Sequence, residues 1–509
     1  MSDPLLIGID AGTTNIKALA ATPDGVIMAE ASRPNPAVHT GPERAHYEPE
    51  AMWMAVVATL REVTDMIEKP ERIVGIAVAS MAETAVPVDG NGKPTFDAIA
   101  WFDKRATGEL DSLVERVGSD RLFEISGLGA HPIFGLCKMM WLRAHEPEIY
   151  AHTERWLHVA DYIAWRLSGV AATDYSLAGR TFALDLKARA WSEETIGAAG
   201  IKPKLFQDLV ASGTPLGPVL AEVAAETGLP RSCKVAAGGF DHAVGAFGVG
   251  ALRPGVMLNS MGTTEAFLLR LDHASTDPMI GRQGYASSLL VIADQPNYFV
   301  VGGTFTAGAA IEWFRKSFAS NADYATLEAE ASSVPAGSLG VGFLPHLRLA
   351  PPPRPYPDAR GAFWGLSTDA DRAVLFRALL EGLNYEARQC ADAMMALPGM
   401  PPIKTVLAIG GGTRDKLRMS IKASLWNQSI AVADISEAVG LGATKLAGLG
   451  AGIFKNAEEA MGASPAHSRE VAPDAELART YERLYQEAYR SALDHLRPLH
   501  DATLSALHP

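Results

Sequence analysis

The chain has 509 residues, of which 48% are hydrophobic and 20% charged, a composition that excludes a disordered protein and predicts large buried cores. Its 45 basic and 58 acidic side chains give a formal net charge of −13 without any run of lysine or arginine, so we expect no nucleic-acid partner. No stretch is long and apolar enough to predict a membrane anchor. The cysteines (Cys137, Cys233 and Cys390) form no CxxC pair and no even disulfide framework, which predicts a reducing compartment, the cytoplasm.

The N-terminal region predicts a mixed sheet. Short apolar runs at residues 5–10, 15–21 and 26–31 are separated by tight-turn residues and predict a three-stranded meander. Helical spacing follows over residues 52–67, and a further buried strand is expected over residues 73–79. Because a hairpin precedes the first helix, this order differs from the alternating βαβ of a dinucleotide-binding fold and predicts an α/β protein with a mixed sheet.

The opening pattern occurs twice. The triplet Gly-Thr-Thr stands at residues 12–14 and again at residues 262–264, in each case between two apolar runs. We interpret this as an internal duplication, with a boundary near the glycine-rich residues 248–254. The predicted division is an N-terminal domain at 1–250, a C-terminal domain at 251–455, and C-terminal helices at 456–509 that pack on the second domain.

The Gly-Thr-Thr turns are candidate phosphate-binding sites. The first, formed by Gly12, Thr13 and Thr14, follows a predicted strand that ends at Asp10. Its small side chains leave N–H groups and hydroxyls free to meet a phosphate, and the carboxylate beside it suits Mg²⁺. An ordinary hairpin turn is the alternative for one copy alone, but the repetition favours one phosphate-binding turn from each half of the chain.

Two further glycine-rich segments predict close approach to a ligand. Gly410, Gly411 and Gly412 lie between a predicted strand and a predicted helix, and Gly308 lies in a small-residue stretch that opens a helix. Residues without a side chain allow a nucleotide to approach the backbone. A plain strand turn and close helix packing are the respective alternatives.

Three other side chains follow predicted strands. Asp241 stands where a helix begins, so it either caps that helix or acts as a general base that accepts the proton of an attacking hydroxyl. Glu83 and Trp101 supply a carboxylate and an aromatic face, which suit a polyhydroxylated ligand. The alternative for this pair is a surface glutamate and a packing tryptophan.

Five motifs of the chain together resemble those of a known family. GIDAGTTNIKALA, WFDKRA, GGFDHAVGAFGVG, NSMGTTEAF and IGGGTRD are similar, in order and spacing, to motifs of the FGGY carbohydrate kinases, and the resemblance runs from about Leu5 to Phe454. It implies an α/β fold of two actin-like (ribonuclease-H-like) ATPase domains. The resemblance further implies that ATP and Mg²⁺ bind in the inter-domain cleft and that the sugar binds mostly to the first domain.

The resemblance also implies residue roles. Asp10 would hold Mg²⁺, and Asp241 would be the base that activates the sugar hydroxyl. Glu83, Trp101, Asp241 and His242 would contact the sugar. The residues expected to contact the nucleotide are Gly12, Thr13, Thr14, Gly262, Thr263, Thr264, Gly308, Gly410, Gly411 and Gly412.

The chain departs from the family pattern at two places. Phe102 replaces the polar residue that is common between the tryptophan and the aspartate, and residues 413–418 replace the usual residues after the glycine run. We therefore expect an ATP-dependent kinase that phosphorylates a primary hydroxyl of a small ketose or polyol, with the sugar itself left open. The alternative is a nucleotide-switched binding protein of the actin-like superfold that phosphorylates no sugar. A homodimer is expected from the resemblance alone.

Overall fold

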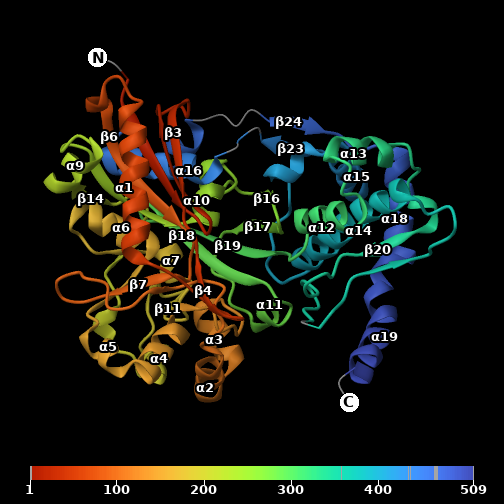
Figure 1. Cartoon of the computed structure of the whole chain (residues 1–509), viewed down its shortest axis with the longest axis horizontal. Helices are drawn as coiled ribbons and strands as arrows, with labels where there is room; N and C mark the ends of the chain where they lie inside the picture. The colour runs from red at the N-terminus through yellow and green to blue at the C-terminus, as the bar shows by residue number, and fades with distance from the viewer. Residues whose placement is uncertain (1–2, 357, 434, 436, 464–467, 508–509) are drawn as a thin grey trace.

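The computed structural model describes residues 3–356, 358–433, 435, 437–463 and 468–507, and its framework is two mixed β-sheets (Figure 1). The N-terminal sheet has the order β14-β15-β6-β1-β2-β3 and the C-terminal sheet the order β18-β19-β17-β16-β22-β23-β24. The N-terminal strands are β1 (Leu5–Ala11), β2 (Asn15–Ala21), β3 (Ile27–Pro34), β6 (Ile73–Ser80), β14 (Pro215–Pro218) and β15 (Lys234–Phe240). The C-terminal strands are β16 (Val256–Met261), β17 (Glu265–Leu271), β18 (Ala286–Ile292), β19 (Gln295–Thr304), β22 (Thr405–Ile409), β23 (Ile430–Ala433) and β24 (Ser468–Val471).

The two sheets repeat one topology. In the first, β1 pairs antiparallel with β2 and β2 with β3, whereas β1, β6 and β15 run parallel. In the second, β16 pairs antiparallel with β17 and β17 with β19, whereas β16, β22 and β23 run parallel. Each sheet also carries an antiparallel strand on the far edge, β14 and β24. The predicted meander, mixed sheet and duplication are confirmed by this shared strand order.

The N-terminal sheet is covered on both faces. Strand β1 is buried because its alternate residues face opposite layers. One layer contains helices α1 (Pro49–Asp65) and α6 (Val159–Ser168), and the other contains α10 (Asp241–Gly248) and α16 (Ala438–Ala451). Close approach of α16 requires Gly8, since a Cβ there would lie 2.0 Å from the carbonyl oxygen of Gly440.

Helix α16 crosses from one half of the chain to the other. It falls within the predicted range 251–455, yet it packs against β1, β6 and β15, and Figure 1 shows its blue ribbon among the red and orange N-terminal strands. Small residues dominate the helix, which lets it lie close to the sheet. Sequence order and spatial grouping therefore differ at this helix.

Between β3 and β15 the chain also forms short strands and helices that lie outside the six-stranded sheet. Those strands are β4 (Val38–Gly41), β5 (Arg44–Tyr47), β7 (Ala85–Val88), β8 (Ala98–Ile99), β9 (Arg155–His158), β10 (Thr173–Asp174), β11 (Leu184–Asp185), β12 (Ala190–Trp191) and β13 (Leu209–Val210). The helices are α2 (Thr107–Val117), α3 (Ser119–Ser126), α4 (Gly135–His145), α5 (Pro147–His152), α7 (Tyr175–Ala178), α8 (Glu193–Ala199) and α9 (Ala221–Thr227).

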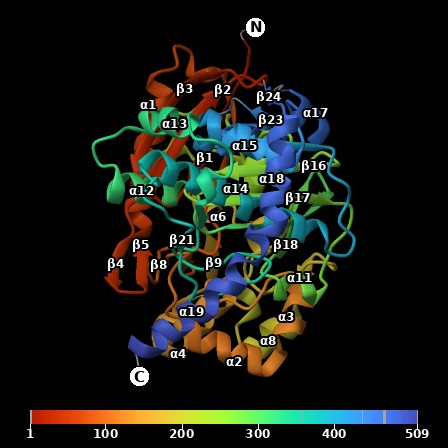
Figure 2. The same ribbon diagram turned by 90° about the vertical axis from the view of Figure 1, so that its right-hand side faces the viewer.

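The C-terminal half packs its helices beside the second sheet. Figure 2 shows α18 and α19 following one another, with the C-terminus at the end opposite the N-terminus, and α18 contacts α15. Among the described residues, no helix is long and apolar enough to cross a membrane. The remaining elements are α11 (Pro278–Arg282), α12 (Gly308–Phe318), α13 (Tyr324–Ser332), β20 (Gly342–Leu344), β21 (Ala362–Trp364), α14 (Arg372–Met395), α15 (Lys416–Trp426), α17 (Ala457–Gly462), α18 (Ala475–Glu487) and α19 (Ala492–Leu507).

Candidate active site

Both Gly-Thr-Thr triplets form the tight turns of β-hairpins. The N–H of Gly12 donates to the carbonyl of Asn15 at 3.0 Å, and the N–H of Gly262 donates to the carbonyl of Thr264 at 2.9 Å. The second turn is exposed to solvent at all three residues. Within the residues that the structure describes, no hydrogen bond joins the two turns, so each half of the chain presents its own half-site.

Helix α12 is docked onto the second turn. The N–H of Gly308 donates to the carbonyl of Gly262 at 3.1 Å, and the N–H groups of Ala307 and Ala309 donate to the carbonyl of Thr263 at 3.1 Å. A Cβ on Gly308 would lie 2.7 Å from that Gly262 oxygen. Close helix packing thus accounts for this glycine, and a contact between Gly308 and a nucleotide stays a prediction.

The three-glycine turn packs on the end of β16. Gly410 has φ 95°, and a Cβ there would lie 2.6 Å from the carbonyl oxygen of Met261. A Cβ on Gly412 would lie 2.9 Å from Nη1 of Arg418. A Cβ on Gly411, in contrast, would meet no atom within 4 Å, so this residue faces open space beside the second turn.

Asp10 lies among other carboxylates at the carboxyl edge of the N-terminal sheet. Parallel pairing of β1, β6 and β15 brings Asp10, Ser80 and Phe240 to that edge. Burial raises the pKa of Asp10 to about 7, and the charges of Asp241 and Glu437 act in the same direction. A cavity of about 320 Å³ borders Asp10 and includes Lys17, whose Nζ donates to Glu437 at 3.1 Å. Burial and the two neighbouring carboxylates thus outweigh the opposing charge of Lys17 at Asp10.

Asp241 is the first residue of α10, and its side chain is 21% exposed. The N-cap residue is Phe240, and among the described residues the Asp241 carboxylate accepts one hydrogen bond, from the adjacent His242 N–H to Oδ1 at 2.6 Å. It therefore does not cap the helix, and its other oxygen, Oδ2, accepts no hydrogen bond from the described residues. Burial raises the pKa of Asp241, the charge of Glu83 adds to this effect, and His242 and Arg180 oppose it.

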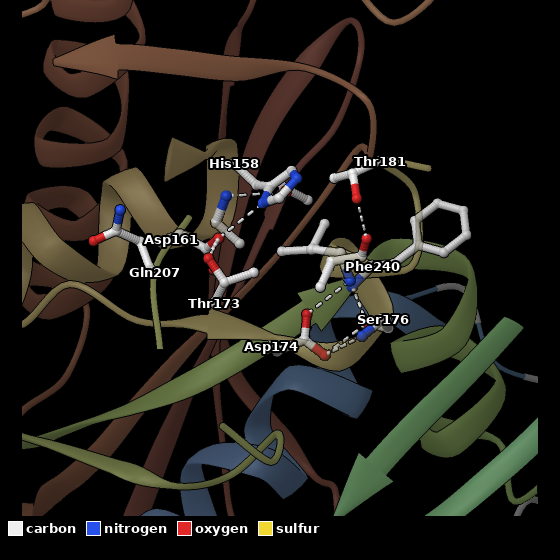
Figure 3. A network of polar contacts seen from close by, with 12 residues as sticks. His158, Asp161, Thr173, Asp174, Ser176, Thr181, Gln207 and Phe240 are labelled. Carbon is white, nitrogen blue, oxygen red and sulfur yellow. Dashed lines mark hydrogen bonds and ion pairs between the residues drawn. The ribbon is translucent and has the colours of Figure 1, made fainter. Parts of the chain in front are cut away.

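A buried polar network fixes the strand end that carries Asp241 (Figure 3). The Asp174 carboxylate accepts hydrogen bonds from the Ser176 hydroxyl at 2.8 Å and from the Ser212 hydroxyl at 3.0 Å. The Ser176 hydroxyl oxygen in turn accepts the N–H of Phe240 at 2.9 Å. Because every member is buried or partly buried and bonded, the network holds the residue before Asp241 in one position.

Glu83 has a strained backbone and a fixed carboxylate. Its φ is 59°, in the left-handed region that non-glycine residues rarely adopt. The carboxylate is 6% exposed and accepts Arg180 Nε at 2.6 Å, with Arg180 Nη2 at 2.5 Å. The Arg180 guanidinium also lies over the rings of Phe134 and Phe240, which leaves Glu83 little freedom to turn.

A buried lysine, Lys138, supports this segment from α4. Its Nζ donates to the carbonyl of Glu83 at 2.8 Å, to Ala100 at 2.8 Å and to Ile99 at 3.3 Å. These bonds join the strand ends that carry Glu83 and Trp101. Sequence reasoning missed Lys138 and Arg180, because a single basic residue within a helix or loop carries no pattern that reveals its partner.

Trp101 reaches the first Gly-Thr-Thr turn. Its Nε1 donates to the Thr13 hydroxyl at 3.0 Å, and the indole is 37% exposed. The His242 ring is more exposed and stacks on Phe240, with centroids 5.0 Å apart. Trp101, Glu83 and Asp241 therefore stand at one edge together with the turn at Thr13, whereas the His242 ring lies along Phe240.

Replacing Lys138 by Met should weaken binding of the sugar that the family resemblance implies at Glu83 and Trp101. The substitution keeps the length of the side chain but removes three hydrogen bonds to buried carbonyls, so we expect the free energy of unfolding to fall by about 3 kcal/mol. The KM for sugar should rise about 10-fold, because Glu83 and Trp101 lose their common support. Lys445→Met, which breaks a buried bond to the Gly248 carbonyl, is the control and should leave the sugar KM unchanged. An unchanged KM in Lys138→Met would contradict this role.

Comparisons with known proteins decide the family. Residues 5–248 match the N-terminal domain, and residues 257–451 the C-terminal domain, of the FGGY family of carbohydrate kinases. The chain belongs to this family. It is 28% identical to a xylulose kinase of Bacillus subtilis (strain 168) over 98% of this chain and 99% of that one. It is also 29% identical to an L-fuculokinase of Escherichia coli (strain K12) over 90% of this chain and 95% of that one.

The fold agrees with that of solved family members. The structure of a xylulose kinase from Rhodospirillum rubrum superimposes with a TM-score of 0.88 at 27% identity, covering 98% of this chain and 100% of the other. The protein therefore has two actin-like, ribonuclease-H-like domains, as expected. As a member of the FGGY family it is a sugar kinase, an enzyme of a class that uses ATP as the phosphate donor, generally with Mg²⁺.

Proposed function

We propose that the enzyme transfers the γ-phosphate of ATP to a primary hydroxyl of a small ketose or polyol, with Asp241 as the general base. The observation that carries this proposal is the position of Asp241, which shares an edge with Asp10, Glu83 and the first Gly-Thr-Thr turn. A carboxylate at a helix start that does not cap the helix, has a raised pKa and keeps one oxygen without a hydrogen bond from the described residues is suited to accept a proton.

The donor set fits a nucleotide with its magnesium ion. Asp10 lies near further carboxylates, and the neighbouring cation, Lys17, is already paired with Glu437. Among the described residues, no three His, Cys, Asp or Glu side chains form a metal-binding group, which agrees with an ion held by one or two carboxylates, phosphate oxygens and water. Bound Mg²⁺ would neutralise charge on the phosphates, and we propose Asp10 as its protein ligand.

We propose that backbone groups hold the phosphates. The turns at 12–14 and 262–264 and the glycines at 410–412 present small side chains, and a Cβ on Gly411 would stand in open space. This arrangement suits a chain of net charge −13, because backbone N–H groups can hold a polyanion without a basic surface. The two half-sites would act together when the domains close, which would also exclude water.

In this proposal the sugar lies against Trp101 and Glu83. The ring of Trp101 offers an exposed face, and the Glu83 carboxylate, oriented by Arg180, accepts hydroxyl hydrogen bonds. Asp241 takes the proton of the hydroxyl that attacks phosphorus. His242 would contact the sugar at the outer side of the site, where its ring stacks on Phe240.

The similarity to xylulose kinases and an L-fuculokinase supports a ketose, because these relatives are named for such substrates. The similarity to a gluconokinase of Bacillus subtilis, 27% identical over 86% of this chain and 86% of that one, adds a sugar acid to the candidates. We also propose the domain ranges 1–250 and 251–455, with C-terminal helices from 456, and a homodimer. A cytoplasmic location is supported by Cys137, Cys233 and Cys390, which are all free and buried.

The test is ADP release with Mg·ATP against a panel of C3–C7 ketoses, polyols and sugar acids. We expect one member to stimulate ADP release strongly over the rate without sugar. The phosphorylated carbon is then assigned by ³¹P and ¹³C NMR of the product. A flat panel with a basal ATPase rate would contradict the proposed substrate class and favour a nucleotide-switched binder.

A further inference from the structure

A buried ion cluster lies directly behind the second Gly-Thr-Thr turn and the three-glycine turn. Its members are Glu265, the residue after Thr264, and Arg418 and Lys422 of α15, each no more than 1% exposed. Arg418 Nη2 donates to Glu265 Oε2 at 2.5 Å, and Lys422 Nζ donates to the other oxygen, Oε1. The Asn259 amide also donates to Oε1 at 3.0 Å, so both oxygens of Glu265 are occupied.

The cluster is not a requirement of the hairpin. The duplicated N-terminal turn has Asn15 at the position that matches Glu265. Asn15 is exposed, and among the described residues its side chain bonds to its neighbour Thr14 and to no other residue. A hairpin of this kind therefore forms without a buried carboxylate at that position. The second turn differs because α15 places two basic side chains, four residues apart on one helix face, against its base.

Arg418 also touches the three-glycine turn. Its Nη1 lies 2.9 Å from the position of a Cβ on Gly412, so the guanidinium lies under that residue. Among the residues that the structure describes, Nε and Nη1 of Arg418 have no hydrogen-bond partner, although the side chain is fully buried. A guanidinium is always charged, and leaving two of its nitrogens unpaired in the interior is unfavourable for folding alone.

We propose that Arg418 and Glu265 are positioning residues for the nucleotide, because their ion pair holds the turn at 262–264 and the turn at 410–412 in one fixed relation. Glu265 is bonded to the first of these turns through the chain, and Arg418 lies under the second. The inference rests on the proposed function, in which both turns contact ATP. Neither residue touches the nucleotide, and both act through the backbone of the turns.

A purely structural role predicts a different result from a positioning role. The control is the ion pair of Arg377 and Glu381 in α14, whose side chains are 5% and 4% exposed and whose Nε and Oε1 atoms are 2.9 Å apart. Arg377 also donates to the hydroxyl of Tyr481 at 2.7 Å, and Tyr481 lies far in the sequence from either turn. Breaking either pair should lower the melting temperature, but only the pair behind the turns should change nucleotide affinity.

The experiment measures the Kd for Mg·ADP by calorimetry, the KM for ATP and the KM for sugar in full-length variants. We expect Arg418→Met and Glu265→Gln to raise the Kd for ADP and the KM for ATP about 10-fold, with the sugar KM within about twofold of wild type. Arg418→Lys keeps the cation with a compact head group and provides a milder variant, for which we expect an intermediate Kd. Arg377→Met should leave the Kd for ADP within about twofold of wild type.

Two results would overturn the inference while leaving the proposed function intact. One is an unchanged Kd for ADP in both Arg418→Lys and Glu265→Gln, and the other is an equal rise in Arg377→Met. If the wild-type protein itself binds no ADP and phosphorylates no sugar, the proposed function fails, and the inference fails with it. The two failures are thus distinguished by the wild-type measurement.

Discussion

Asp241→Asn is expected to lower kcat by a factor on the order of 10²–10⁴, because the amide keeps the shape of the side chain but cannot accept the proton of the sugar hydroxyl. The Kd for ADP and the KM for sugar should change little, since the backbone turns and the pair of Glu83 and Arg180 remain in place. Single-turnover and steady-state assays with the sugar found in the panel measure both effects.

Asp371→Asn is the matched control for that variant. Asp371 also begins a helix, but it caps α14 by accepting the N–H of Val374, a role that asparagine also fills. Its kcat should stay close to wild type. A kcat for Asp241→Asn above about one tenth of the wild-type value would remove Asp241 from the role of base.

The same residue predicts a pH dependence. A base must be deprotonated to act, and burial raises the pKa of Asp241 above its ordinary value of 3.8. The value of kcat/KM should therefore fall as the solution becomes acidic, with an apparent pKa above 3.8 that belongs to the interacting pair of Asp10 and Asp241. Asp241→Asn should change how kcat/KM depends on pH in the acidic range. A pH profile of kcat/KM with the same shape as that of wild type would contradict the role of Asp241 as the base.

Asp10→Asn is expected to abolish most turnover and yet stabilise the protein. Loss of the proposed Mg²⁺ ligand should lower kcat by at least about 100-fold. Burial raises the pKa of Asp10 from 3.8 to about 7, so the folded state disfavours the charged form. In the absence of divalent ions, that carboxyl contributes stability at low pH, and this contribution is lost as the pH rises toward and through 7.

Thermal unfolding in EDTA measures the second effect. At pH 8 the Asp10→Asn protein should melt about 2 °C above wild type, and the difference should shrink toward pH 5, because Asn never becomes charged. Asp103→Asn, in contrast, should melt below wild type at pH 8. Burial alone would raise the pKa of Asp103, but the hydrogen bonds from Arg105 and from the N–H of Ala45 lower it, so removing that charge costs stability. Equal melting temperatures of wild type and Asp10→Asn at both pH values would contradict the inference that the charged form of Asp10 destabilises the folded state.

Local patterns in the sequence predicted the strands and turns of the two half-sites. Alternating burial and tight-turn residues specify the first meander, and the predicted runs agree with β1, β2 and β3 within a few residues. The same holds for the glycine run, because φ 95° at Gly410 is a local backbone conformation that disfavours a side chain there. Features of this kind depend on residues near one another in the chain, which is why the family motifs could be found in the sequence.

The tertiary structure alone decided which distant side chains support the site. Lys138 lies 55 residues from Glu83, Arg180 lies 97 residues from Glu83, and Arg418 lies 153 residues from Glu265. A single lysine or arginine inside a helical pattern reads as a solvated residue, because its burial and its partner depend on how the elements pack.

The tertiary structure also decided where α16 packs on the N-terminal sheet. Its small residues permit close approach to any surface, and only the assembled fold selects β1, β6 and β15. The sequence by itself therefore predicted the family, through the resemblance of its motifs, and it predicted the duplicated turns and the candidate base, because these stand in short local patterns. The fold decided how those groups are oriented and charged, because long-range contacts and burial set both.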